Sequence, residues 1–226
     1  DEGTQFNDYK DTYNDYIQYK EQNSAMRKAK KIIKDFNGDT HKTVLFLSYK
    51  AENWNTMDNI YKKYCQEKDI KVIVQCVPYY YKNIDGTFEK YIDGGMYPEY
   101  VTITPIEDYN YVNENPDVIV FQYPYDNYNS AGKSGPVFYS YNLASHTQKL
   151  IYIPYFRTDE IDENDMRAYT NMDAYVTMPG VVYADKVIVQ SEEIRKLYIK
   201  KLTDFFGEES EDEWEDKIEA EDIGGI

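Results

Sequence analysis

The stretch "TVLFLSYKAENWN" (residues 43–55) sets the fold class of this chain. It begins with a continuous, mostly apolar run, which is typical of a strand covered on both faces. The polar and aromatic residues after this run predict a loop. Beyond the loop, Met57, Ile60, Tyr61 and Tyr64 recur at helical spacing. The stretch therefore predicts a strand, a loop and a helix in succession, which is the repeating unit of α/β proteins.

The same alternation continues along the 226 residues of the chain. Further strands are predicted at 70–77, 101–104, 116–122, 149–155, 174–178 and 185–190, and further helices at 138–147, 160–172 and 191–206. Because the strands are rich in β-branched residues and alternate with helices, the sequence predicts an α/β fold. Its expected form is a Rossmann-like, mostly parallel sheet of about six strands with helices on both faces.

The two ends of the chain differ from this central domain, which we expect over residues 41–206. Apolar residues over 4–36 approximate helical spacing, and "NGD" (37–39) stops the helix, so residues 1–40 are expected to form an N-terminal helical extension outside the Rossmann core. Residues 207–226 carry ten acidic residues and one lysine. We expect an acidic surface helix and an inter-domain linker there; a frayed, solvated tail is the alternative.

Composition narrows the classes of partner. The net charge of −16 disfavours nucleic acid, because phosphate binding requires a basic face. The basic run "RKAKKIIK" (27–34) predicts a solvated helix face, with a contact to membrane or phosphate as the alternative. The chain contains no apolar run of about 18 residues and no recognisable signal peptide. We therefore expect a cytoplasmic protein, with peripheral contact at the inner face of the membrane as an alternative.

Several common catalytic and ligand-binding motifs are absent from the sequence. There is no dinucleotide-binding fingerprint, no P-loop and no nucleophile elbow, and Cys65 and Cys76 have no metal-ligand spacing. We therefore expect no metal and no bound cofactor. His41 and His146 are weak candidates for a general base, so no catalytic residue is assigned from the sequence.

Polar and aromatic clusters follow the predicted strands. They read "SYKAENWN" (48–55), "PYYYKN" (78–83), "QYPYDNYN" (122–129), "PYF" (154–156) and "QSEE" (190–193). If the sheet is parallel, these loops meet on one rim beyond the carboxyl ends of the strands, where open α/β sheets bind ligands. A wall of this kind suits a polyol, sugar or nucleotide; a surface that packs on a neighbouring domain is the alternative. The residues expected to line the rim are Tyr49, Lys50, Trp54, Tyr123, Asp126 and Tyr155.

Two loops are of special interest. In "FQYPYDNYNS" (121–130), Pro124 is expected to let the chain leave the sheet at once. At least one ring of its tyrosines should then face the rim beside Tyr49 and Trp54. For Asp126 a turn or capping role is the alternative to a cleft role. Residues 78–100 are predicted to be one long loop, either functional or disordered.

An ordered set of motifs resembles a known family. The motifs are "FLSYKAENWNTMDNIY", "VPYYYKNIDGTF", "YPEYV", "PDVIVFQYPYDNYN", "LIYIPYF" and "PGVVYADKVIVQSEEIRKLYI". Together, over roughly residues 43–217, they resemble the amino-terminal half of CDP-glycerol glycerophosphotransferase family proteins. That family is similar to teichoic-acid polymerases and looks like a two-domain glycosyltransferase of the GT-B type.

The resemblance implies an acceptor-side domain of an enzyme that transfers glycerol phosphate from CDP-glycerol to a polyol-phosphate or glycan acceptor. It also implies a carboxyl-terminal partner domain that makes most of the donor contacts and that we expect to be missing from this chain. Lys50 would meet a phosphate as a point charge. The teichoic-acid polymerases carry a histidine, proposed as the base, in an HGTP-like segment; the corresponding "YIPYF" (152–156) contains none. The alternative from another class is a non-catalytic glycan- or protein-binding module.

Overall fold

The structure is a computed structural model that describes residues 12–36, 38, 41–129, 132–159, 161–162 and 164–224. The expected beginning of the first helix at residues 4–11 lies outside the described residues. So do Asn37 and Asp39 of the predicted stop signal, and Ser130 at the end of the tyrosine-rich turn.

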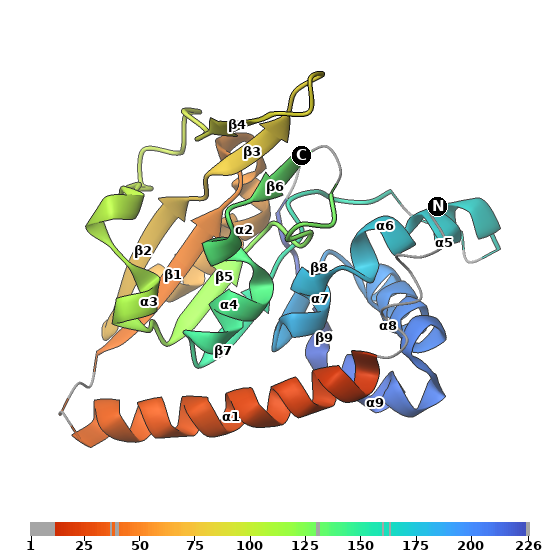
Figure 1. The fold of residues 1–226 in the computed structure, drawn as a ribbon, viewed down its shortest axis with the longest axis horizontal. Coiled ribbons are helices and arrows are strands. Elements are labelled where there is room, and N and C mark those ends of the chain that lie inside the picture. The colour runs from red at the N-terminus through yellow and green to blue at the C-terminus, as the bar shows by residue number, and fades with distance from the viewer. Residues whose placement is uncertain are drawn as a thin grey trace.

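A six-stranded parallel sheet forms the centre of the molecule (Figure 1). In spatial order its strands are β2 (Ile70–Cys76), β1 (Lys42–Ser48), β5 (Val118–Phe121), β7 (Lys149–Tyr152), β8 (Lys186–Val189) and β9 (Ile218–Ala220). The predicted Rossmann-like α/β fold is therefore confirmed. The strand order reverses between β1 and β5, because β2 lies on one side of β1 and all later strands of this sheet lie on the other.

Helices cover both faces of this sheet, which explains the continuous apolar run of β1. Leu45 and Leu47 belong to one core, and Val44 and Phe46 belong to the core on the opposite face. The first face is covered by α4 (Ser140–Ser145), α7 (Pro179–Tyr183) and α8 (Glu192–Phe206), and the second by α2 (Asn55–Cys65). Successive residues of a strand point to opposite faces of the sheet. When both faces are buried, every successive residue must therefore be apolar.

The N-terminal helix α1 (Thr12–Phe36) lies across the amino-terminal ends of the strands (Figure 1). Its first half joins the core through Tyr16, which is buried and stacks on Trp214 with ring centroids 6.0 Å apart. Trp214 belongs to the acidic helix α9 (Glu211–Lys217). The expected N-terminal helix is therefore present, but it does not lie wholly outside the core as expected, because Tyr16 belongs to the core.

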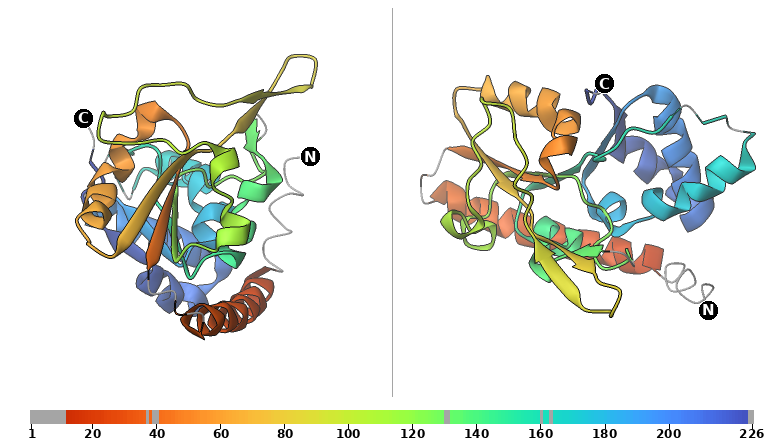
Figure 2. Two further views of the ribbon diagram at one scale, coloured as in Figure 1. Left: turned by 90° about the vertical axis from the view of Figure 1, so that its left-hand side faces the viewer. Right: turned by 90° about the horizontal axis from the view of Figure 1, so that it is seen from above.

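Two strands of a second, antiparallel sheet lie within residues 78–100, which the sequence predicted as one long loop. This sheet consists of β3 (Tyr79–Lys82), β4 (Phe88–Tyr91) and β6 (Gly132–Ser134). The hairpin of β3 and β4 projects beyond the carboxyl ends of the main sheet (Figure 2). The loop prediction was wrong because "YYYK" and "FEKY" pair with each other and the first of them also pairs with residues 132–134, and the local pattern of such short segments does not reveal their partners.

Three further expectations need correction. Residues 173–176 form helix α6 and not a strand, because Met172 and Val176 are buried one helical turn apart. Residues 101–104 contribute only an isolated bridge between Val74 and Ile103. Strand β9 lies within the segment expected to be a linker, where Ile218 is fully buried. That segment therefore completes the sheet.

The remaining elements are short. They are α3 (Tyr111–Glu114) and α5 (Met166–Asn171), with 3-10 helices at Ala51–Asn53, Ile106–Asp108, Pro136–Phe138 and Glu208–Ser210. None of the helices in the described ranges has the length and apolar character that crossing a bilayer requires.

Candidate functional site

The candidate site lies at the carboxyl edge of the main sheet, where β1 and β5 end side by side. This is the topological switch point, since the strand order reverses between these two strands. The loops after the two strands diverge toward opposite sides of the sheet, and ligands of open α/β sheets bind in the crevice that this divergence opens.

The buried side chain of Gln122 fixes the geometry of this edge. Its Oε1 accepts a hydrogen bond from the backbone N–H of Tyr49 at 3.0 Å. Its Nε2 donates to the carbonyl oxygen of Asn53 and to Oγ1 of Thr56, both at 2.9 Å. The first residue after β5 therefore holds the loop after β1, and with it the position of Tyr49.

Tyr49 is the centre of a tyrosine cluster, which we define as Tyr49, Tyr79, Tyr81, Tyr123, Tyr125 and Tyr155. The Tyr49 ring lies 5.1 Å from the Tyr79 ring, 5.0 Å from the Tyr123 ring and 5.1 Å from the Tyr155 ring, measured between centroids. These residues come from the loop after β1, from β3 and from the loops after β5 and β7. Four segments distant in sequence thus contribute aromatic surface to one place.

Lys50 adds the cationic group of this cluster. Its Nζ lies 5.4 Å from the Tyr49 ring centroid and 5.8 Å from the Tyr79 centroid. It also lies 3.4 Å from Oε1 of Glu52. A cation over aromatic faces is attracted by their quadrupoles and keeps its charge available to an anionic ligand.

Tyr81 is the most distinctive titratable group of the cluster. Burial alone would raise the pKa of its phenol, but hydrogen bonds with Tyr79, Lys50 and Tyr49 and the charge of Lys50 lower it. The pKa values of Tyr49 and Tyr79 are raised, first by burial and then by Tyr81. The two neighbours therefore remain neutral phenols that can donate hydrogen bonds to the Tyr81 oxygen. The Tyr81 side chain is 40% exposed, so a ligand can reach it.

The structure brings together four of the six residues that the sequence placed on the rim: Tyr49, Lys50, Tyr123 and Tyr155. Trp54 is not among them. It is 2% exposed and packs on Phe46 and Tyr61 in the core under α2, with ring centroids 6.2 and 5.1 Å away. Because α2 begins at Asn55, the chain has already turned onto that face of the sheet when it reaches Trp54.

Asp126 follows Tyr125 of the tyrosine cluster, but its carboxylate bonds Ser140 and takes the capping role. Its Oδ1 accepts from the backbone N–H of Ser140 at 2.9 Å, and its Oδ2 accepts from the Ser140 hydroxyl at 2.8 Å. Burial raises the pKa of Asp126 to about 7, against the effect of these two hydrogen bonds. Its φ of 49° places it in the left-handed region, which Asp tolerates in turns.

The other rings of the 121–130 turn divide between core and surface. The Tyr123 hydroxyl donates to the carbonyl oxygen of Gly132 at 2.8 Å. The Tyr125 hydroxyl lies 3.4 Å from that of Tyr155, and the Tyr128 side chain is 45% exposed. Tyr123 lies beside Tyr49, but it is buried and does not face an open rim, and the other expected neighbour, Trp54, lies in the core.

Tyr79 and Tyr81 were not among the residues predicted from the sequence, although the segment that contains them was. The available signal was the spacing of two residues between these tyrosines, since alternate residues of a strand share a face. Tyr79 and Tyr81 lie together for this reason, with ring centroids 4.8 Å apart.

Within the described ranges, no group of three or more His, Cys, Asp or Glu side chains is arranged to hold a metal ion. No protein-family model, curated protein or solved structure matches this chain.

Proposed function

We propose that this chain is the acceptor-side domain of a CDP-glycerol-dependent glycerophosphotransferase and that its tyrosine cluster binds a polyol-phosphate or glycan acceptor. The observation that carries the proposal is the convergence of the cluster and Lys50 on the switch point between β1 and β5. The resemblance of the motifs over residues 43–217 supplies the class of reaction.

The chemistry of the cluster suits such an acceptor. A polyol phosphate offers C–H faces that pack on aromatic rings, hydroxyl groups that exchange hydrogen bonds with phenols, and a phosphate that pairs with an ammonium group. The half-buried rings of Tyr49 and Tyr155 supply the first kind of contact, Tyr81 the second and Lys50 the third. A carboxyl-terminal domain would supply the donor contacts and close the site.

The transfer also requires a proton acceptor. The attacking hydroxyl oxygen of the acceptor forms a bond to the glycerol-bearing phosphorus, the bond from that phosphorus to CMP breaks, and the hydroxyl proton must leave. We propose Tyr81 as the group that accepts the proton, because hydrogen bonds with Tyr79, Lys50 and Tyr49 and the charge of Lys50 lower the pKa of its phenol against the effect of burial. This role is consistent with the absence of histidine from "YIPYF" (152–156).

Calorimetric titration of the chain with a glycerol phosphate oligomer tests the acceptor site. We expect saturable binding that Lys50→Met and Tyr81→Phe each weaken about tenfold, since a hydrogen bond to a charged group contributes roughly 1.5–3 kcal/mol. Lys82→Met and Tyr141→Phe are matched controls, because both side chains are exposed and lie outside the cluster. These variants should bind like the wild type.

Two results would contradict the proposal. One is the absence of binding, and the other is equal weakening by the control variants. Binding of an uncharged glycan that is indifferent to Lys50→Met would favour the non-catalytic glycan-binding module. Titration of the chain joined to its carboxyl-terminal domain, with CDP-glycerol and separately with the free nucleotide, tests the donor side.

A further inference from the structure

The carboxyl-terminal half of α1 turns its polar side toward the protein. Four polar side chains at spacings of three or four residues hold it there by hydrogen bonds or ion pairs of 2.6–3.1 Å. They are Asn23 with the Ala144 carbonyl, Arg27 with Asp185, Lys30 with Asn115 and Lys34 with Asp117. This spacing places all four on one helix face. The inward part of the basic run is therefore paired and does not form the solvated face that the sequence predicted.

The opposite face of the same helix half is apolar and bare. Ile32, Ile33 and Phe36 are 68, 60 and 89% exposed, and Met26 is 38% exposed. These residues form one stripe, which we call the apolar stripe. A surface helix normally buries its apolar side and exposes its polar side, and α1 reverses this arrangement in its second half. A contiguous apolar surface of this kind marks an interaction site.

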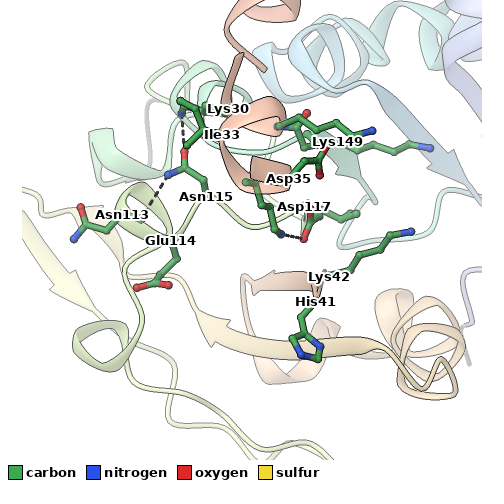
Figure 3. A pocket seen from close by; sticks show the side chains of 14 residues that line it. Lys30, Ile33, Asp35, His41, Lys42, Asn113, Glu114, Asn115, Asp117 and Lys149 are labelled. Carbon is green, nitrogen blue, oxygen red and sulfur yellow. Dashed lines mark hydrogen bonds and ion pairs between the residues drawn. The ribbon is translucent and has the colours of Figure 1, made fainter. Parts of the chain in front are cut away.

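A cleft beside the apolar stripe carries lysines that are available to a partner. It has a volume of about 1010 Å³ and lies between α1 and the amino-terminal ends of β1, β5 and β7 (Figure 3). Lys31, Lys42 and Lys149 line it and are exposed. Within the described part of the chain, none of the three side chains makes a hydrogen bond or an ion pair. Ile33 belongs to both the cleft and the apolar stripe, so the two surfaces are continuous.

We propose that the apolar stripe and the lysines of this cleft dock the protein on an anionic membrane surface. Interfacial helices place isoleucine and phenylalanine at the boundary between headgroups and acyl chains, with lysines in contact with the headgroups. The net charge of −16 opposes this contact only weakly, because charges beyond a Debye length of about 8 Å are screened at physiological ionic strength.

A second copy of the chain is a poorer occupant of this surface. A two-fold symmetric contact pairs the same patch on both subunits, so the unpaired lysines of one copy would face those of the other. The docking surface is also separate from the tyrosine cluster. The docking surface lies at the amino-terminal ends of the strands of the main sheet, and the tyrosine cluster lies at their carboxyl ends. Docking therefore does not depend on the proposed transferase role.

Vesicle flotation tests the proposal. The chain is mixed with vesicles of phosphatidylcholine that contain about one third phosphatidylglycerol, and in parallel with pure phosphatidylcholine vesicles. We expect binding to the anionic vesicles that weakens as salt is added, and much weaker binding to the neutral ones. The double substitution Ile33→Glu and Phe36→Glu should lower the partition coefficient about tenfold or more. Lys31→Gln and Lys42→Gln should each lower it about fivefold.

Matched controls come from the β3–β4 hairpin, where Ile84 is fully exposed and Lys82 and Lys90 are exposed. Ile84→Glu, Lys82→Gln and Lys90→Gln should leave the partition coefficient unchanged. Absence of binding to the anionic vesicles, or equal losses in these controls, would overturn the proposal. So would a dimer in sedimentation that Phe36→Glu dissociates while vesicle binding is absent, because the surface would then be a protein interface.

Discussion

The side-chain Oε1 of Gln122 accepts a hydrogen bond from the backbone N–H of Tyr49 at 3.0 Å, and this bond joins the ends of the two strands between which the strand order of the main sheet reverses. The two residues are far apart in sequence. Their contact places the Tyr49 ring where the rings of β3 and of the loops after β5 and β7 can reach it. The candidate site therefore depends on one buried amide.

Replacement of Gln122 by alanine should lower the free energy of unfolding by roughly 2–4 kcal/mol, because buried partners such as the Tyr49 N–H and the Asn53 carbonyl lose their hydrogen bonds. Chemical denaturation measures the loss. Gln66→Ala is the control, since Gln66 is exposed and its replacement should change stability by less than about 0.5 kcal/mol. Equal stability of the two variants would show that the Gln122 bonds contribute nothing.

Gly180→Ala should destabilise the protein by about 1–3 kcal/mol or more through overpacking. A Cβ at Gly180 would lie 2.4 Å from Cα of Pro124, and the backbone N–H of Gly180 donates to the Pro124 carbonyl at 2.8 Å. The turn that carries Tyr123 would have to move. Gly94→Ala is the matched control, because no atom lies within 4 Å of the added Cβ. A wild-type melting temperature for Gly180→Ala would refute this prediction.

Trp214→Ala should lower the free energy of unfolding by about 3–5 kcal/mol, as large-to-small changes in a core do. Trp214 is fully buried, stacks on Tyr16 and donates from Nε1 to Oγ of Ser210 at 2.8 Å. The exposed neighbour Glu215 provides the control, and Glu215→Ala should be nearly neutral. If Trp214→Ala were equally neutral, the carboxyl-terminal segment would not be part of the cooperative fold.

Asp126 should make the protein more stable at pH 4 than at pH 7. The pKa of its carboxyl is about 7 in the folded protein and 3.8 when unperturbed, so between these values the folded protein retains a proton that the unfolded chain releases. The resulting stability is complete below the lower value and is lost as the pH rises through the upper one.

Thermal denaturation of wild type and Asp126→Asn from pH 4 to 7 measures this effect. The stability of the wild type relative to the variant should fall by roughly 2–4 kcal/mol over that range. Asp212→Asn, at an exposed position, should run parallel to the wild type. A wild type that gains stability relative to Asp126→Asn as the pH rises would reverse the sign and disprove the assignment.

The chain alone should release no CMP from CDP-glycerol. In the proposed two-domain enzyme the second domain holds the donor opposite the acceptor. Positioning two reactants in this way lowers the activation barrier by roughly 7–11 kcal/mol. A coupled assay for CMP, with the two-domain protein as the positive control, measures this. Turnover by the chain alone would contradict the division of labour between the domains.

The fold class and part of the candidate site could be predicted from the order of the amino acids alone. Runs such as "TVLFLS" (43–48) are apolar at nearly every successive position, and a strand buried on both faces requires that. Because a parallel sheet brings all its strand ends to one edge, Tyr49, Lys50, Tyr123 and Tyr155 could be placed together before any contact was known. These inferences need only local periodicity and the geometry of a parallel sheet.

The direction of side chains in short or amphipathic segments, by contrast, depends on long-range packing. Trp54 was predicted to be a rim residue but lies in the core. It directly precedes the first residue of α2, and its ring packs beneath that helix. Ile218 completes the main sheet from within an acidic segment, and its burial depends on a neighbouring strand distant in sequence. Ile33 and Phe36 face solvent because the polar face of α1 forms ion pairs with Asp185 and Asp117 of the main domain. Each of these outcomes depends on a long-range contact, and a local pattern of hydrophobicity does not encode which partner is present.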